Sequence, residues 1–280
     1  MVLLDGKSLS KKIRLEIKEK VDQLKEKGVT PGLAFILVGD NPASQLYVNM
    51  KTKACEEAGI YSINHRMPSS VSEEELISVI KMLNANPMVH GVLVQLPLPE
   101  HIREERIIEA IDYRKDVDGF HPYNMGRLVR GNPLFYPCTP LGIIKLFEEY
   151  RISLKGKDVT IVGAGNITGK PLASMLTNRF ATVTLCHIHT KGLSEKTKKA
   201  DIVVSAVGKP GLISAEMVKE GSVVVDVGIS RVGNRVVGDV DFEAVSRKAS
   251  FITPVPGGVG PMTIAMLLFN TVKAVETSGS

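Results

Sequence analysis

A tyrosine and a lysine one helical turn apart are the first residues in this chain whose types and spacing indicate chemistry. Segment 44–58 predicts a helix that begins at a capping serine, Ser44, and ends at Gly59. We expect Tyr47 and Lys51 on its apolar face. Removal from water disfavours the ammonium form of a lysine, so Lys51 is a candidate proton carrier. The alternative is a lysine that follows the apolar face and places its charge in solvent.

Two further polar residues come from a strand end and a turn. Gln95 interrupts the apolar run 91–97 near its carboxyl end, the edge where open α/β sheets place ligands. Asp118 lies in the acid-rich turn 115–120, before a glycine, where an aspartate also serves ordinary turn chemistry. Both are candidates for the site of Lys51.

Three glycines predict a dinucleotide site in the second half of the chain. Gly163, Gly165 and Gly169 follow an apolar run and open a predicted helix, with one residue more than the commonest fingerprint. Glycine lets the backbone approach a pyrophosphate, which the N–H groups of the helix then bind. The alternative is a tight turn without a ligand.

The end of the next strand indicates which dinucleotide binds. NAD-specific folds place an acid about 20 residues after the glycines, and this chain has none there. Its strand ends in Cys186, His187, Ile188 and His189, which favours NADP. The cysteine and histidines could instead bind a metal, but neighbours on a strand point to opposite faces and no second ligand cluster follows. We therefore expect no metal centre.

The elements that must position these residues predict an α/β protein of two domains. Helical patterns alternate with short runs rich in valine and isoleucine, which is typical of parallel sheets covered by helices. The segment 112–138 has many glycines and prolines and predicts a long functional loop without regular structure. The predicted helices are 7–27, 44–58, 72–85, 139–150 and 262–276, and the predicted strands are 33–39, 91–97, 158–165, 182–187, 201–208 and 222–229.

Composition excludes several classes of function. The chain has 280 residues, 44% hydrophobic and 23% charged, which is ordinary globular material. Its net charge of +5 raises the question of nucleic acid, but basic and acidic residues alternate along 7–27, so we expect no nucleic-acid partner. No apolar run approaches the roughly 20 residues that span a bilayer. Three well-separated cysteines predict reduced thiols, and we expect a cytoplasmic protein without a membrane partner.

At this point the sequence resembles the bifunctional methylenetetrahydrofolate dehydrogenase/cyclohydrolase family over essentially its whole length. The segments are long and jointly specific. They are VGDNPASQLYVNMKTKACEEAGI (38–60), GVLVQLPLP (91–99), KDVDGFHP (115–122), PCTPLGI (137–143), VGAGNITGKP (162–171), VVVDVGI (223–229) and PVPGGVGPMT (254–263).

The resemblance implies two reactions on tetrahydrofolate one-carbon derivatives. The first oxidises 5,10-methylenetetrahydrofolate to the methenyl form with NADP, and the second hydrolyses that product to 10-formyltetrahydrofolate. The nitrogens beside the reacting carbon drive hydride loss, so the protein mainly aligns the reactants. Ring opening needs proton movement, which suits Lys51. The resemblance also implies a homodimer and a place in purine biosynthesis.

The resemblance gives each candidate residue a role. Tyr47 would stack against or position the folate, Gln95 would orient Lys51, and Asp118 would bind the pterin. A carboxylate suits that task because it accepts two parallel hydrogen bonds from an aminopyrimidine edge. The backbone at Gly257, Gly258 and Pro261 would close over the folate near the nicotinamide, and the cofactor residues would be Gly163, Ala164, Gly165, Ile188 and Ile229.

The implied fold is an N-terminal α/β catalytic domain and a C-terminal Rossmann-type doubly wound parallel sheet, joined by long helices. We expect the folate-binding domain to span 1–138, completed by helix 261–276, and the NADP-binding domain to span 139–253. One departure concerns the cofactor. Many family members carry Arg-Ser after the first glycine and a serine after the strand-two histidine, where this chain has Ala164, Gly165 and Ile188. NAD use or dual use therefore stays open.

Three other interpretations compete with this one. Tyr47 and Lys51 match the Y-x-x-x-K pair of short-chain dehydrogenases, but in those enzymes the pair follows the glycine fingerprint, whereas here it precedes Gly163. Another two-domain dehydrogenase is the nearest alternative. A non-catalytic NADP-sensing module would bind the cofactor with turnover indifferent to Lys51.

Overall fold

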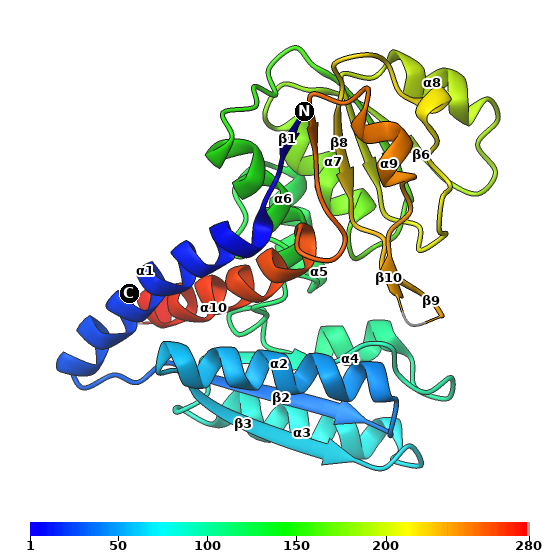
Figure 1. Ribbon diagram of the computed structural model, residues 1–280. Coiled ribbons are helices and arrows are strands. Elements are labelled where there is room, and N and C mark those ends of the chain that lie inside the picture. Colours follow the sequence, from blue (N-terminus) through cyan, green and yellow to red (C-terminus); the bar gives the residue numbers. More distant parts are fainter. Residues whose placement is uncertain (234, 279–280) are drawn as a thin grey trace. The chain divides into compact units, whose positions relative to one another are not determined.

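Two parallel sheets organise the chain, each in its own unit (Figure 1). The computed structural model describes residues 1–233 and 235–278. The N-terminal unit holds Lys12–Arg127, Asn132–Cys138 and the chain from Ile264 onward. The C-terminal unit holds Met1–Lys11, Leu128–Gly131 and Thr139–Thr263.

The N-terminal unit has a parallel three-stranded sheet in the order β3-β2-β4. Its central strand is buried at every residue, so helices must cover both faces. Alternate residues Ala34, Ile36 and Val38 pack in one core cluster with α3 and α4, while α2 contacts β2 and β3. The elements are β2 (Gly32–Val38), α2 (Pro42–Ala58), β3 (Tyr61–Met67), α3 (Glu73–Ala85), β4 (Gly91–Val94) and α4 (Glu104–Ala110).

Helix α2 is fixed at both ends by local chemistry. The side chain of Asn41 accepts hydrogen bonds from the backbone N–H groups of Ala43 and Ser44, so the predicted cap at Ser44 was wrong. Asparagine is a strong N-cap, and Pro42 then occupies the first turn, where its missing N–H costs nothing. Gly59 ends the helix with a left-handed φ of 74°, as predicted.

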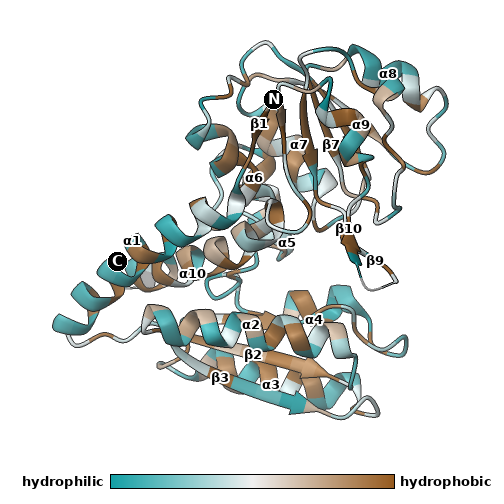
Figure 2. Cartoon of the chain, in the orientation of Figure 1, coloured by the Kyte–Doolittle hydropathy of each residue, from teal (hydrophilic) through white to brown (hydrophobic). Residues whose placement is uncertain are grey.

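The prediction that 112–138 lacks regular structure was wrong. Helix α5 (Pro122–Val129) lies within it and begins at a proline, whose fixed φ suits a first helical turn. Strand β3 and helix α4 were not predicted. The sequence of β3, YSINHRM, is polar and partly exposed at a sheet edge, and Figure 2 shows it more hydrophilic than β2.

The C-terminal unit has a six-stranded sheet in the order β1-β11-β8-β7-β5-β6, parallel throughout. The predicted strands of this half are confirmed with shorter ends. A separate antiparallel pair joins β9 (Ser230–Val232) to β10 (Arg235–Val237). The other strands are β1 (Val2–Leu3), β5 (Asp158–Val162), β6 (Thr182–Cys186), β7 (Ile202–Ser205), β8 (Val223–Asp226) and β11 (Phe251–Ile252).

The order of strands gives the sheet a topological switch point. From β5 the chain first adds β6 on one side and then β7 on the other. In doubly wound sheets the ligand crevice lies outside the carboxyl ends of the strands at such a reversal. The strand order therefore predicts a ligand crevice at the carboxyl ends of β5 and β7. The helices of this unit include α6 (Cys138–Glu149), α7 (Gly169–Thr177), α8 (Leu193–Lys199) and α9 (Phe242–Ser246), with a 3-10 turn at Ala215–Met217.

The two longest helices begin in one unit and end in the other. Helix α1 (Gly6–Glu26) leaves the C-terminal unit at Lys11, and α10 (Val259–Ser278) leaves it at Thr263. Among the described residues, no helix is both long enough and apolar enough to cross a membrane.

Candidate active site

Lys51 lies on the buried face of α2, with a relative exposure of 9%. The buried stripe of this helix runs through Ser44, Val48, Lys51 and Cys55 at helical spacing. Tyr47, predicted on the same face, is instead 36% exposed. It lies one turn before Lys51 but outside the stripe that packs on the sheet, so its ring is accessible to a ligand.

Gln95 holds the Lys51 side chain by a direct hydrogen bond. Lys51 Nζ donates to Gln95 Oε1 at 2.9 Å, and Gln95 Nε2 donates to the carbonyl oxygen of Leu96 at 2.7 Å. The second bond fixes the amide so that its oxygen faces the lysine. Gln95 directly follows β4, and its backbone N–H donates to the carbonyl of Ile36 on the neighbouring strand. The predicted partnership of Lys51 and Gln95 is thus present at a strand end.

Asp118 interacts electrostatically with Lys51 in the same unit. Burial raises the pKa of Asp118, while the Lys51 charge and a hydrogen bond with the Cys138 thiol act in the opposite direction. The residue keeps some solvent contact. Three side chains therefore face one region. They are Lys51 from α2, Gln95 from the end of β4, and Asp118 from the turn after residue 115. That set of groups can move a proton and bind a polar ring edge.

Asp116, which the sequence prediction passed over, builds the turn that carries Asp118. Its carboxylate accepts backbone N–H groups from Gly119 at 3.1 Å and His121 at 2.8 Å, and the side-chain amide of Asn124 at 2.8 Å. The residue is 2% exposed, and burial raises its pKa to about 7. The turn therefore contains two aspartates, Asp116 and Asp118. They differ in how they bind backbone N–H groups, a difference that the sequence does not reveal.

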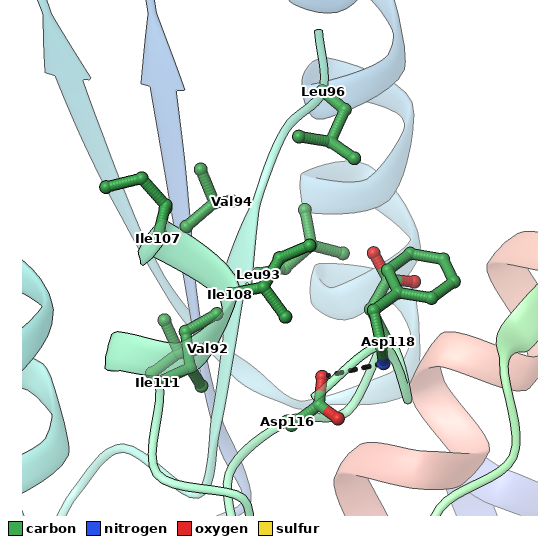
Figure 3. Close-up of a pocket in the computed structure, with 10 residues that line it drawn as sticks. Val92, Leu93, Val94, Leu96, Ile107, Ile108, Ile111, Asp116 and Asp118 are labelled. Atoms are coloured by element: carbon green, nitrogen blue, oxygen red, sulfur yellow. Dashed lines mark hydrogen bonds between the residues drawn. The ribbon is translucent and has the colours of Figure 1, made fainter. Parts of the chain in front are cut away.

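A small apolar cavity adjoins this turn (Figure 3). Asp116 and Asp118 contribute its only carboxylates among the lining residues, and the remaining wall comes from β4, α4 and the turn. The apolar lining residues are Val92, Leu93, Val94, Leu96, Ile107, Ile108, Ile111 and Phe120.

Asn270 on α10 binds the backbone at two points of the predicted loop that contains Asp118. Its Nδ2 donates to the carbonyl oxygens of Val117 at 2.8 Å and Tyr136 at 2.9 Å, and it lies 3.7 Å from Cys138 Sγ. Asn270 is buried. The sequence prediction missed it because an asparagine inside an apolar helix has no local pattern that names its partner.

In the C-terminal unit, the predicted glycine turn lies at the switch point of the sheet. Gly163 has a φ of 115°, which favours glycine, and a Cβ there would collide with the carbonyl oxygen of Ala206 after β7. A Cβ at Gly169 would collide with the carbonyl oxygen of Gly163, so the helix packs directly on the turn. At Gly165 a Cβ would meet no atom within 4 Å. The backbone there is open to a ligand.

The start of α7 suits an anionic group. Thr168, its N-cap, makes no side-chain cap hydrogen bond, and the first turn contains no acidic residue. The backbone N–H of Lys170 donates to the carbonyl oxygen of Gly165 at 3.1 Å and Pro171 has no N–H, so in this first turn the N–H of Gly169 is the group left to bind a phosphate. The turn therefore fits the pyrophosphate of a dinucleotide.

Exposed apolar side chains follow the carboxyl ends of four neighbouring strands. Ile188 follows β6 and is 94% exposed, and Ile229 follows β8 and is 51% exposed. Val207 after β7 and Ile167 after β5 are 47% and 44% exposed. Together they form an apolar rim that suits the flat rings of a dinucleotide. Only Ile188 and Ile229 were predicted, because the register of the strand ends decides the other two.

Around Ile188 the strand end is polar and exposed. The backbone N–H of His189 donates to Nδ1 of His187 at 3.2 Å, and the two ring centroids are 6.1 Å apart. Cys186 is buried while both histidines are exposed. Over the described residues, no group of three or more histidine, cysteine or acidic side chains is placed to hold a metal ion.

The predicted glycine segment before α10 is largely engaged by the protein itself. Gly257 has a φ of 111°, and its carbonyl accepts the backbone N–H of Lys7 at 2.8 Å. Gly258 is buried, and a Cβ there would lie 2.6 Å from the carbonyl oxygen of Pro254. Pro261 is half-buried in the first turn of α10. Close packing thus accounts for Gly258 without a ligand, whereas Pro261 keeps an accessible surface.

Two family models match the chain. Residues 4–118 match the model described as Tetrahydrofolate dehydrogenase/cyclohydrolase, catalytic domain, and residues 137–279 match Tetrahydrofolate dehydrogenase/cyclohydrolase, NAD(P)-binding domain. The chain is 64% identical over 277 residues to the bifunctional protein FolD of Nautilia profundicola, covering 99% of this chain and 98% of that protein. It is 57% identical to the FolD protein of Moorella thermoacetica, covering 98% of each chain.

Solved structures agree with these matches. The bifunctional FolD methylenetetrahydrofolate dehydrogenase/cyclohydrolase of Campylobacter jejuni superposes with a TM-score of 0.98 at 56% identity, covering 99% of both chains. The Trypanosoma brucei N5,N10-methylenetetrahydrofolate dehydrogenase-cyclohydrolase, solved with NADP cofactor and an inhibitor, superposes with a TM-score of 0.96 at 38% identity. The alignment covers 100% of this chain and 98% of that one.

Proposed function

Because the chain belongs to the tetrahydrofolate dehydrogenase/cyclohydrolase family, we propose that Lys51, Gln95, Tyr47 and Asp118 carry its folate chemistry. The enzyme oxidises 5,10-methylenetetrahydrofolate to 5,10-methenyltetrahydrofolate with NADP and hydrolyses the product to 10-formyltetrahydrofolate. The observation that carries the proposal for the residues is the 2.9 Å hydrogen bond between buried Lys51 and Gln95, with Asp118 facing the same lysine.

In the oxidation step the protein acts by alignment. NADP supplies the hydride acceptor when bound. The lone pairs of the two folate nitrogens drive hydride loss, so this step needs no strong base, and accurate positioning supplies most of the acceleration. Asp118 fixes the pterin and the exposed ring of Tyr47 stacks on the folate, which sets the position of the reacting carbon.

In the hydrolysis step Lys51 moves a proton. Water attacks the amidinium carbon and must lose a proton, and the departing ring nitrogen must gain one. Lys51 acts in this step as the neutral amine: its Nζ takes the proton from water, becomes an ammonium, and returns the proton to the departing nitrogen. Gln95 accepts one N–H of Lys51 and is itself locked by its bond to Leu96, so the amine keeps one direction during the transfer.

In the C-terminal unit we assign NADP binding to Gly163, Ala164, Gly165, Ile188 and Ile229. The support is the open backbone at Gly165, the start of α7, which has no side-chain cap and no acidic residue, and the apolar rim. We keep Gly257, Gly258 and Pro261 as proposed folate-contacting positions, with the accessible Pro261 the best supported of the three.

The division of labour along the chain is also a proposal. The folate-binding domain comprises residues 1–138 completed by helix 261–276, and the NADP-binding domain comprises 139–253, although Met1–Lys11 belong to the C-terminal unit. We further propose a cytoplasmic homodimer that serves purine biosynthesis, as the resemblance implies. Sedimentation of the purified protein tests the dimer directly, because a monomeric mass would refute it.

The test of the site replaces Lys51 by methionine. We expect hydrolysis of added methenyltetrahydrofolate to fall by about 100- to 10,000-fold, the usual contribution of a positioned proton carrier. The affinity for NADP should stay near that of the wild type, because Lys51 lies in the other unit. Retained hydrolysis would remove Lys51 from the mechanism.

Lys53 provides the matched control. It lies on the same helix two residues later and is exposed, so Lys53→Met removes the same charge outside the buried stripe. Both activities should survive this change. Loss of hydrolysis in both variants would point to net charge rather than to the buried lysine.

A further inference from the structure

Two buried carboxylates lie at the carboxyl ends of β7 and β8. Asp226 is the last residue of β8 and is 4% exposed, and Asp239, after β10, is 0% exposed. No described salt bridge includes either one. Buried charge of this kind is stable only when hydrogen-bond donors surround it, and backbone N–H groups are the main donors here.

Asp239 binds the end of β7 and the segment that follows it through three hydrogen bonds. Its Oδ2 accepts the Ser205 hydroxyl and the backbone N–H of Val207, each at 2.8 Å. Its Oδ1 accepts the backbone N–H of Lys209 at 2.7 Å. Three donors from five consecutive residues thus converge on one side chain that is distant in sequence, so the path of the chain after β7 depends on Asp239.

Asp226 in turn holds Asp239 and the segment after β8. Its Oδ1 accepts the backbone N–H groups of Gly228 at 3.0 Å and Asp239 at 2.9 Å, and its Oδ2 accepts that of Val240 at 2.9 Å. The two aspartates therefore form a relay, by which we mean the carboxylates of Asp226 and Asp239 linked through the Asp239 N–H. The relay couples the ends of two adjacent strands.

Two glycines leave room for the relay. A Cβ at Gly228 would collide with the Asp239 carboxylate, and a Cβ at Gly238 would collide with the Asp226 carboxylate. Side chains at these positions would displace the carboxylates from the backbone they bind. The spacing of aspartates and glycines in 226–239 is thus dictated by this contact.

The segments held by the relay form part of the dinucleotide crevice. The carbonyl of Ala206 lies against Gly163, and a Cβ on Gly163 would be 3.4 Å from Cγ2 of Val207. Val207 is bound through its N–H by Asp239, and Ile229 directly follows Gly228, which Asp226 binds. Both side chains belong to the apolar rim and are exposed, although buried polar contacts fix their backbone. Exposed apolar groups on a rigid backbone are characteristic of a preformed ligand wall.

We propose that Asp239 and Asp226 are positioning residues for NADP, which set its affinity by holding Val207 and Ile229 at the carboxyl edge of the sheet. Neither aspartate contacts the cofactor in this proposal. It rests on the proposed placement of the dinucleotide at the Gly163 turn.

The test compares Asp239→Asn, which changes the contacts at the carboxyl end of β7, with a control variant, Asp201→Asn, at the amino end of β7. Asp201 precedes β7, and its carboxylate accepts the backbone N–H of Asp158 at 2.9 Å and Lys219 Nζ at 2.6 Å. It therefore ties strand starts together much as Asp239 ties strand ends, but away from the crevice. The measurements on each full-length variant are NADPH affinity by fluorescence titration, KM for NADP against kcat, the thermal midpoint, and hydrolysis of added methenyltetrahydrofolate without dinucleotide.

We expect Asp239→Asn to raise the NADPH Kd by about tenfold or more, as loss of a charge-assisted hydrogen bond does. KM for NADP should rise more than kcat falls, and hydrolysis should stay at the wild-type rate. Asp201→Asn should lower the thermal midpoint while its NADPH Kd stays unchanged. An unchanged Kd in Asp239→Asn, or an equal rise in Asp201→Asn, would overturn the proposal.

Two further variants keep the result interpretable. If Asp239→Asn does not fold, Ser205→Ala removes one donor from the same carboxylate and should raise the Kd by roughly threefold; no rise would count against the relay. Gly165→Val tests the placement itself, because a Cβ there meets no protein atom within 4 Å. If it leaves NADPH binding intact, the placement fails, whereas lost binding in Gly165→Val with normal binding in Asp239→Asn refutes the relay alone.

Discussion

Replacing Asp116 by asparagine should change how the stability of the protein depends on pH. Asp116 is almost fully buried, and burial raises its pKa from 3.8 to about 7. In the unfolded chain the same group titrates near its ordinary value. Between these two values the unfolded state releases a proton that the folded state keeps, so stability falls as pH rises through this window.

The size of the effect follows from the shift. About three pKa units correspond to about 4 kcal/mol of unfolding free energy, present at pH 4 and lost by pH 8. The asparagine of the variant cannot titrate, although its amide replaces one acceptor oxygen and carries a pH-independent cost. Relative to the variant, the wild type should therefore be about 4 kcal/mol more favoured at pH 4 than at pH 8.

The assay is urea unfolding of both proteins at several pH values from 4 to 8. At each pH the unfolding free energy of Asp116→Asn is subtracted from that of the wild type. Asp112 provides a control, because a hydrogen bond from Arg114 lowers its pKa. Its contribution to stability is present above its ordinary pKa of 3.8 and is lost only below it, so the difference between wild type and Asp112→Asn should stay nearly constant across pH 4 to 8. If the difference in unfolding free energy between wild type and Asp116→Asn stays constant across pH 4 to 8, burial does not raise the pKa of Asp116 and the prediction is refuted.

Two other outcomes follow from the proposed binding sites. Asp118→Ala should weaken folate binding more than NADP binding in parallel titrations, because only the pterin meets that carboxylate, and equal losses would indicate a general folding defect. With 5,10-methylenetetrahydrofolate as substrate, KM for NADP should be lower than KM for NAD, since no acid follows β6 at the ribose position; a lower KM for NAD would contradict the preference.

Strands β5 to β8 of the C-terminal sheet were predictable because their residues form continuous runs rich in β-branched side chains, whereas the two-residue strands β1 and β11 were not predicted. Runs such as Ile202–Ser205 and Val223–Asp226 are buried on both faces, which makes them apolar at nearly every position. Strand β3 carries alternating polar residues at a sheet edge, and α5 contains glycine and a starting proline. In both cases contacts with distant segments decide the structure, so local composition misled the prediction.

The proposed site was partly predictable for the same reason. Lys51 and Gln95 were each singled out because they stand in apolar elements, the family resemblance paired them, and the structure joins them by a hydrogen bond. Tyr47 was assigned to the wrong side of α2, since the helix packs along the stripe through Ser44 and Cys55. The relay of Asp226 and Asp239 had no local signature, because backbone N–H groups, which nearly every residue has, are its main partners.

The pairing of β1 with β11 has a consequence for synthesis on the ribosome. Val2 pairs with Phe251, so strand β1 gains its neighbour only after residue 251 has been made. The three strands of the N-terminal sheet lie between Gly32 and Val94 and can pair much earlier. Asn270, which holds Val117 and Tyr136, arrives later still. Early pairing within 32–94 and late contacts from Phe251 and α10 leave the partly synthesised chain with exposed surface, and exposed intermediates of this kind are where chaperones act.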